Sequence, residues 1–272
     1  MFLIKNIIGN YWKLLYIIKN NFHINKIFSY SNIKMHLQKL TFNLAYILLI
    51  GSSILTGFES LNTFTKEILP LKYILSIETC VTIIASIAYA FLTQSYATNQ
   101  NFDLTFYRYL DWFATTPLLL LSLIIYLSYL KNKDENKQTP ETEDDTFNII
   151  LKDKKIIIIM LLNFLMLVFG YMGETKLINY ILANCLGFIP FIIMLYLIWT
   201  NYCHSSNINV FIAFSIIWSM YGIVYFFDNN SKNISYNILD IIAKVGFGLL
   251  IWYQVVQYKL NTIDNETKDA KN

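Results

Sequence analysis

The chain has 272 residues, of which 56% are hydrophobic, 17% aromatic and only 14% charged. A soluble domain carries about a quarter charged residues, whereas the apolar excess here is gathered into blocks of about twenty residues, the length that a helix needs to cross a bilayer. The net charge of +3 is too small and too scattered to indicate nucleic-acid binding, and the cysteines (Cys80, Cys185 and Cys203) show neither metal-ligand spacing nor a disulfide pattern. The composition therefore predicts an all-α integral membrane protein whose partner is the lipid bilayer.

The N-terminal segment, residues 1–36, is a basic extension. It contains "MFLIKNIIGNYWKLLYIIKNNFHINKIF", in which lysines alternate with apolar and aromatic residues at roughly helical spacing. Such a pattern is typical of an amphipathic helix in the membrane interface. A poorly ordered extension, or a segment ahead of a start codon at Met35, is the alternative. No small-residue cleavage site is present, so we do not interpret it as a signal peptide.

Seven apolar blocks follow, and each predicts one transmembrane helix: 40–58, 71–94, 106–130, 155–172, 180–200, 210–227 and 238–258. The segment "KNKDENKQTPETEDD" after the third block is charged and contains proline, which predicts a disordered acidic loop over 131–150. The expected organisation is thus a seven-helix domain over 37–260, followed by a polar C-terminal tail over 261–272.

The orientation in the membrane is ambiguous from lysine counting. If the N-terminus lies outside, the cytoplasmic loops hold more lysines than the external loops, as the positive-inside rule requires. The lysine-rich N-terminal extension favours the opposite orientation. Composition leaves both orientations open.

Several charged residues lie inside the predicted spans, where they are costly and usually functional. In "LDIIAKVGFGLLIWYQ" of the seventh span, Asp240 and Lys244 are four residues apart and therefore share one helix face. The third span begins with "RYLDWFATTPLLLLS", whose polar residues fall on one stripe of a helix: Arg108, Asp111, Thr115 and Ser122.

A buried lysine near carboxylates suits covalent chemistry. Burial favours the neutral amine, which can condense with a carbonyl to form a Schiff base. A protonated Schiff base on Lys244 would need counterions, and Asp111, Asp240 and Arg108 together would bring the net charge near zero. A simple ion pair between Asp240 and Lys244 is the alternative, but it leaves Asp111 unexplained.

The motifs "RYLDWFATTPLLLL" and "DIIAKVGFG" resemble the third and seventh helices of the microbial (type 1) retinal rhodopsins, and the resemblance extends over the seven-helix region. It implies a seven-helix bundle with the N-terminus outside and the C-terminus cytoplasmic. It also implies all-trans retinal bound as a Schiff base on Lys244. The chain is rich in isoleucine, asparagine and lysine, which is similar to the viral and protist members of this family.

The same resemblance implies roles for individual residues. Asp111 matches the primary counterion and proton acceptor, and Asp240 the second counterion. Arg108 matches the arginine outside them. Thr115 matches the threonine that hydrogen-bonds the acceptor, and Tyr89 the tyrosine that hydrogen-bonds the second counterion.

A retinal pocket is implied as well, and in the sixth span "IIWSMYGIVYF" resembles its packing segment. Two residues there depart from the common pattern: Gly222 replaces a proline, and Tyr225 replaces a tryptophan. Both are expected to reshape the pocket near the ionone ring. The implied pocket residues are Trp112, Thr116, Leu119, Trp218, Tyr221 and Tyr225.

The triplet Asp111, Thr115 and Ser122 resembles an outward proton pump at its first position but departs at its third. Ser122 replaces the carboxylic acid that returns a proton from inside. Glu78 is an alternative donor, because it lies eleven residues before Tyr89 and so about 16 Å toward the cytoplasm, the depth of Ser122. We therefore expect Glu78 to share a hydrogen bond or a water with Ser122; a solvated glutamate near the interface is the alternative.

Two other functions stay open: a light-gated cation channel and a photosensor. The second span offers one buried acid where channels of this family have several, and Thr116 stands where many algal channels have a cysteine, so a pump is favoured over a channel. No kinase or cyclase is fused, and no soluble transducer is visible. Asp228 and Glu174 are interpreted as solvated loop residues. The resemblance also implies a homo-oligomer, either a trimer or a pentamer.

Overall fold

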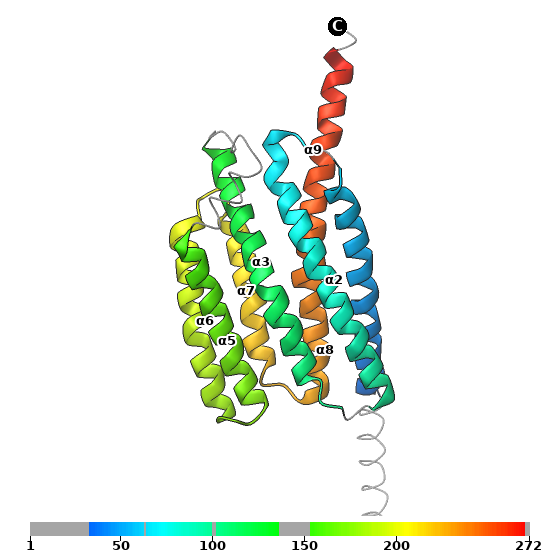
Figure 1. Cartoon of the computed structure of the whole chain (residues 1–272), viewed down its shortest axis with the longest axis vertical. Helices are drawn as coiled ribbons and strands as arrows, with labels where there is room; N and C mark the ends of the chain where they lie inside the picture. The colour runs from blue at the N-terminus through cyan, green and yellow to red at the C-terminus, as the bar shows by residue number, and fades with distance from the viewer. Residues whose placement is uncertain (1–32, 63, 100–101, 136–152, 270–272) are drawn as a thin grey trace, which may run out of the picture.

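The structure is a computed structural model that describes residues 33–62, 64–99, 102–135 and 153–269, and within these ranges it contains helices and no strand (Figure 1). The first helix is Ile33–Ser60. The remaining elements are η1 (Lys66–Ile68), α2 (Leu69–Thr98), α3 (Thr105–Asp134), α5 (Lys154–Glu174), α6 (Tyr180–Tyr202), α7 (Ile208–Val224), α8 (Asn229–Asp240), the π-helical turn η2 (Ile241–Gly246) and α9 (Phe247–Asp269).

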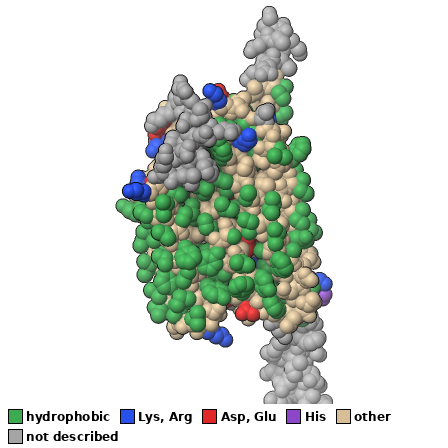
Figure 2. Space-filling view, in the orientation of Figure 1, with side chains coloured by type: hydrophobic (Ala, Val, Ile, Leu, Met, Phe, Trp, Pro, Cys, Tyr) green, Lys and Arg blue, Asp and Glu red, His purple; other side chains and the backbone are tan. Residues whose placement is uncertain are grey.

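The helices form one bundle in which all seven predicted spans are present. Six are long and apolar enough to cross a membrane, the last being the continuous α8, η2 and α9, and α7 is a shorter apolar helix. Hydrophobic side chains cover the middle of the visible face, while charged ones gather toward its two ends (Figure 2). Because lipid tails offer no hydrogen bonds, this surface and an all-helical backbone suit a bilayer. The protein is an integral membrane protein.

Two helices extend into segments predicted to be a loop and a tail. α3 continues through Asp134, so the start of the predicted acidic loop is helical. Lys131 and Lys133 lie in its last turn, where cations stabilise the negative end of a helix. α9 continues through most of the predicted polar tail and projects beyond the bundle (Figure 1). Of the basic extension over 1–36, only residues 33–36 are described, and they belong to the first helix. Residues 1–32, with most of the expected amphipathic helix, and the rest of the loop, 136–150, lie outside the described residues.

Side-chain caps fix where three helices begin. The Asp153 carboxylate accepts a hydrogen bond from Lys155 N at 2.9 Å before α5. The Asn179 side chain accepts from Ile181 N and Leu182 N before α6. Asp228 plays the same part before α8. These caps satisfy N–H groups that have no partner within the helix, and they allow short connections between neighbouring helices.

α3 is the most buried of the candidate spans, and it packs against α2, α5 and α6. α2 and α9 are also neighbours. One apolar cluster joins α3, α5, α6 and α7, and another joins α2, α3 and α9. We call the end from which α9 projects the C-terminal end of the bundle, and the opposite end, where the first helix begins, the N-terminal end (Figure 1). α3 and the last helix thus hold their polar residues inside the bundle.

Candidate functional site

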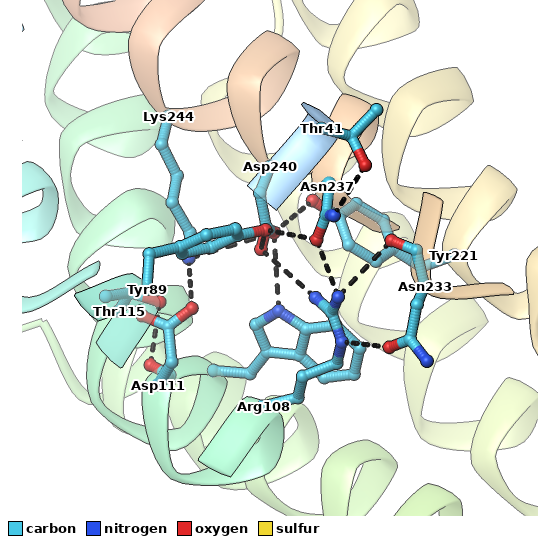
Figure 3. Close-up of polar contacts among 11 residues, drawn as sticks. Thr41, Tyr89, Arg108, Asp111, Thr115, Tyr221, Asn233, Asn237, Asp240 and Lys244 are labelled. Atoms are coloured by element: carbon cyan, nitrogen blue, oxygen red, sulfur yellow. Dashed lines mark hydrogen bonds and ion pairs between the residues drawn. The ribbon is translucent and has the colours of Figure 1, made fainter. Parts of the chain in front are cut away.

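The Lys244 amine lies between two carboxylates in the centre of the bundle. Its Nζ is 2.5 Å from Asp111 Oδ2 and 3.7 Å from Asp240 Oδ1, and all three side chains are 1% exposed. The structure therefore brings together the charged residues that the sequence placed on two separate helices (Figure 3). Arg108 completes a set of two cations and two anions, and such pairing is what buried charges require.

The two carboxylates differ in their hydrogen bonds. Asp240 accepts from Tyr89 Oη at 2.8 Å, from Tyr221 Oη at 2.8 Å and from Trp112 Nε1 at 3.3 Å. Asp111 contacts Lys244 through Oδ2, whereas its buried Oδ1 has no hydrogen-bond partner among the described residues. Donors on both oxygens stabilise the charged form of Asp240. Asp111 has a free oxygen and is better placed to take a proton.

Arg108 is held by asparagines that the sequence analysis missed. Its Nε donates to Asn233 Oδ1 at 2.8 Å and its Nη2 to Asn237 Oδ1 at 2.6 Å, while Nη1 lies 4.0 Å from Asp240 Oδ2. Asn237 also donates to Thr41 Oγ1 at 2.9 Å and so connects the first helix to the site (Figure 3). Both asparagines precede Asp240 at helical spacing, three and seven residues back, and this spacing could have revealed them.

Thr115 is placed differently from its expected role. Its hydroxyl donates to the main-chain carbonyl of Asp111 at 2.8 Å and not to the carboxylate. This is the bond to the residue four positions back that threonine commonly makes in a helix. The Thr115 hydroxyl therefore contacts the main chain of Asp111, the proposed acceptor, and not its carboxylate.

An aromatic cavity leads away from Lys244 between α3, α5, α6 and α7. It is lined by all six residues proposed for the pocket, together with Asp240 and Lys244 themselves. Lining residues not foreseen from the sequence include Met166, Asn184, Phe188, Phe191 and Tyr236. A cavity with apolar walls and an amine at one end fits an elongated apolar aldehyde, which is the chemistry that the lysine predicts.

The two departures in the sixth span have structural counterparts. A Cβ at Gly222 would lie 2.5 Å from Cζ of Phe188, so the Phe188 ring occupies the room that a larger residue would need. Tyr225 is 4% exposed and stacks on Tyr180, with ring centroids 4.1 Å apart. Phe188, Gly222 and Tyr225 thus line one part of the cavity together.

Thr116 has a partner that the sequence did not indicate. Asn163 of α5 is fully buried, and its Nδ2 donates to Thr116 Oγ1 at 2.7 Å. A single asparagine in an apolar block gives no periodic signal, so only the packing of α5 on α3 reveals this contact. It joins the two helices beside the cavity.

Glu78 and Ser122 lie at the same depth, and Ser122 Oγ donates to Glu78 Oε1. Both side chains are 0% exposed, so the solvated alternative for Glu78 is wrong. Glu78 Oε2 is buried and has no hydrogen-bond partner among the described residues. The bundle therefore contains, besides Asp111 and Asp240, a further buried carboxyl group on the C-terminal side of Lys244.

Glu174 was interpreted as a solvated loop residue, and this is wrong. It ends α5 and binds Lys232 Nζ at 2.8 Å, with both side chains about nine-tenths buried. Asp228, by contrast, does precede a helix in a connection, where its side chain is 57% exposed and contacts Lys34 at 3.0 Å. The packing of α8 against the end of α5 could not be deduced from either segment alone.

A seven-helix bundle whose buried lysine lies between two carboxylates, at the end of an aromatic cavity, is the arrangement of the microbial (type 1) rhodopsins. The Bacteriorhodopsin-like protein family model matches residues 36–258. The chain belongs to this family, which implies a retinal chromophore.

Several characterised proteins are similar to this chain. The green-light absorbing proteorhodopsin of Gamma-proteobacterium EBAC31A08 is 28% identical over 176 residues, which is 58% of this chain and 64% of that protein. The alignment thus spans less than two thirds of that relative's length. The crystal structure of the viral rhodopsin OLPVRII has a TM-score of 0.67 and 26% identity, covering 82% of this chain and 99% of that one. Xanthorhodopsin, described as a light-driven ion pump with dual chromophore, has a TM-score of 0.61 at 22% identity, covering 81% and 92%, and shares the fold.

Proposed function

We propose that the protein is a light-driven outward proton pump that carries all-trans retinal as a protonated Schiff base on Lys244. When bound, retinal supplies the light-driven isomerisation that changes the proton affinity of the lysine nitrogen. The observation that carries the proposal is the 2.5 Å contact between Lys244 Nζ and Asp111 Oδ2. It offers a direct path for one proton to a carboxylate whose other oxygen is free.

The outward half of the path begins with proton transfer from Lys244 Nζ to Asp111. Asp240 stays charged throughout, because its hydrogen bonds from Tyr89, Tyr221 and Trp112 stabilise the anion. Beyond Arg108, a large polar cavity at the N-terminal end is lined by Asp103, Glu174 and Lys232 among others. We propose that protons leave through this cavity, which faces the outside.

Glu78 returns the proton from the opposite side. A buried carboxyl group with one serine partner is more stable neutral than charged, so Glu78 can hold a proton until Lys244 needs it. The hydrogen bond that Ser122 donates holds Oε1 of Glu78 toward α3. Ser122 thus assists an acid that the neighbouring helix α2 supplies.

The proposed orientation places the N-terminus outside and the C-terminus in the cytoplasm. In this orientation the C-terminal end of the bundle, from which α9 projects, lies at the cytoplasmic face (Figure 1). We further propose that copies of the chain associate in the bilayer as a trimer or a pentamer, which cross-linking in native membranes can test.

A light-gated cation channel is the second candidate function. It is favoured by one observation: buried polar residues of the first helix, including Ser52 and Thr56, lie beside Glu78 of α2. Photocurrents in voltage-clamped cells supplied with retinal separate the two functions. A pump gives an outward current at every voltage that does not respond to sodium or potassium. A channel gives a current that reverses with the cation gradient, and the absence of any current would favour a photosensor.

A further inference from the structure

Polar side chains gather where the first helix meets α2 and α9, on the C-terminal side of Lys244. Ser52 and Thr56 belong to the first helix, and Glu78 and Thr82 to α2; each is at most 2% exposed. Burying this many polar groups in the membrane interior is costly unless they have partners. The arrangement of their partners is therefore informative.

Two atoms of this group lack a hydrogen-bond partner among the described residues: Ser52 Oγ and Glu78 Oε2. Both residues border Gly248 of α9. A Cβ built on Gly248 would lie 3.6 Å from Ser52 Oγ, from Glu78 Cβ and from Thr56 Cγ2. The glycine therefore leaves room at the meeting point of three helices, and a buried water typically binds polar groups such as these.

A line of polar groups continues from this point toward the C-terminal end. Thr56 Oγ1 lies 2.9 Å from Thr79 Oγ1. Each hydroxyl is also within hydrogen-bond distance of a carbonyl of its own helix, so one can donate to the other while the second donates to its carbonyl. Farther along, Lys259 Nζ binds Glu59 Oε1 at 2.5 Å. Lys259 also lines a cavity at this end with Asn62, Thr65, Ile68, Tyr258, Thr262 and Ile263. Hydroxyl groups both donate and accept hydrogen bonds, so they can pass a proton along such a line.

The neighbouring approach to Glu78 is lined mainly by hydrophobic side chains. The cluster between α2, α3 and α9 consists of Ile68, Leu71, Ile74, Leu75, Ile125, Tyr126, Tyr129, Ile251 and Val255. It includes no residue of the first helix. On this side the described residues offer the contact between Gln254 and the Tyr126 hydroxyl, whereas the side of the first helix offers a longer line of polar groups.

We propose that Ser52, Glu78 and Gly248 form a binding site for a water molecule, and that this site is the last station of a proton-uptake route between the first helix, α2 and α9. The route begins at Glu59 and Lys259 and passes the hydroxyls of Thr56 and Thr79. It rests on the proposed function, because it supplies the proton that Glu78 returns to Lys244. Ser52 acts through the water and is a positioning residue.

The kinetic test compares matched variants of the full chain loaded with retinal. Ser52→Ala removes the hydroxyl, and Gly248→Ala fills the space between the helices. We expect each to slow reprotonation after a flash about tenfold, a fraction of what a positioned acid or base contributes. Azide, a small weak acid that can carry protons to Glu78, should restore the rate. The controls are Ser53→Ala, whose hydroxyl bonds Ile50 O, and Gly51→Ala, where a Cβ meets nothing within 4 Å; both should keep the original rate.

An infrared measurement gives a readout that does not depend on pumping. The carboxyl C=O stretch of protonated Glu78, assigned by its loss in Glu78→Gln, should shift in Ser52→Ala and in Gly248→Ala but not in Ser53→Ala. A merely structural role for Ser52 would change thermal stability without moving this band.

The outcomes separate the route from the proposed function. Light-driven proton movement with unchanged rate and unchanged band in Ser52→Ala would overturn the route and leave the pump standing. A chain that moves no protons in light would overturn the pump. In that case an unshifted band would also remove the water site, whereas a shifted band would support the site without the transport. If Gly248→Ala fails to fold, Ser52→Ala decides alone, because it removes a single oxygen.

Discussion

The two halves of the bundle interior treat buried carboxyl groups in opposite ways. On the N-terminal side of Lys244, Asp240 has three hydrogen-bond donors, and Arg108 is held by two asparagines. On the C-terminal side, Glu78 has one serine donor, and the neighbouring cluster between α2, α3 and α9 is hydrophobic apart from two tyrosine hydroxyls. Donors stabilise a permanent charge, whereas their scarcity favours a neutral acid. The difference indicates that one half is built to keep charges and the other to keep a proton.

Removing Lys244, which lies between the two halves, has the largest expected effect. Lys244→Ala should abolish the visible absorption band of the protein incubated with retinal, because no amine is left at the end of the cavity. Spectroscopy of the purified protein measures this, and borohydride reduction followed by mass spectrometry should locate the retinal adduct at Lys244 in the unmodified chain. Lys39→Ala, on the exposed surface of the first helix, serves as the control. A band that survives in Lys244→Ala would contradict the assignment.

Removing the carboxylate beside the Lys244 amine changes the N-terminal half of the interior. Asp111→Asn should reduce light-driven acidification of the medium at least about 100-fold, since it removes the proton acceptor. The visible band should move to longer wavelength because a counter-charge beside the nitrogen is lost. Asp134→Asn, which changes an exposed acid at the opposite end of α3, should leave both the acidification and the band unaltered.

Glu78→Gln tests the proton-keeping half. Reprotonation after a flash should slow about 100-fold, within the range for a positioned general acid. Ser122→Ala should slow it less, because the acid itself remains. Time-resolved absorption measures both, with the exposed Glu67→Gln as the control. Equal rates in Glu78→Gln and the unmodified protein would assign reprotonation to another group.

Asn237, which connects Arg108 to Thr41, is expected to contribute moderately to stability. Asn237→Leu removes the partner of Arg108 Nη2 and of Thr41, so we expect a loss of about 1–3 kcal/mol, the cost of leaving a buried polar group unsatisfied. Thermal unfolding of the purified protein in detergent measures the change. Asn233→Leu should cost less, because Asn233 is only partly buried. The opposite order would show that Asn233, and not Asn237, positions Arg108.

The smallest expected effect is at the N-terminal edge, outside the membrane-spanning part. Hydrogen bonds from Ser231 and the charge of Lys34 lower the pKa of Asp228 to about 2, against an ordinary value of 3.8. A depressed pKa stabilises the folded state above the ordinary value, and this contribution is lost as the pH falls through about 2. Lys34→Met should therefore raise the pKa of Asp228, which NMR of the carboxyl carbon can follow, and should lower stability at pH 7 by only the small part of the shift that Lys34 causes.

Counting residues along helices predicted much of this site. The spacing of Asp240 and Lys244, the stripe on α3 and the common depth of Glu78 and Ser122 follow from the rise and turn of a regular helix. The partners across helices do not follow from it. Asn237 reaches Thr41, Asn163 reaches Thr116 and Phe188 fills the space at Gly222, and each contact depends on which faces of distant segments meet.

The contact between Glu174 and Lys232 was missed for the same reason. Each residue stands near the end of a predicted span, where a charged side chain is usually solvated. Only the approach of α8 to the end of α5 buries them together. Sequence periodicity describes one helix at a time, so it does not report pairs that form where two helix ends converge.

The π-helical turn around Lys244 changes the direction in which side chains point along the last helix, so that α8 and α9 present different faces to the bundle. An α-helix advances about 100° per residue, and a π-turn accommodates one extra residue, so the faces of α8 and α9 are offset by about that angle. Deleting one residue from 241–246 while keeping Lys244 would restore uniform winding. It would also turn Gly248 away from the first helix, so that a one-residue change in length would reorient half of the helix without altering any side chain at the site.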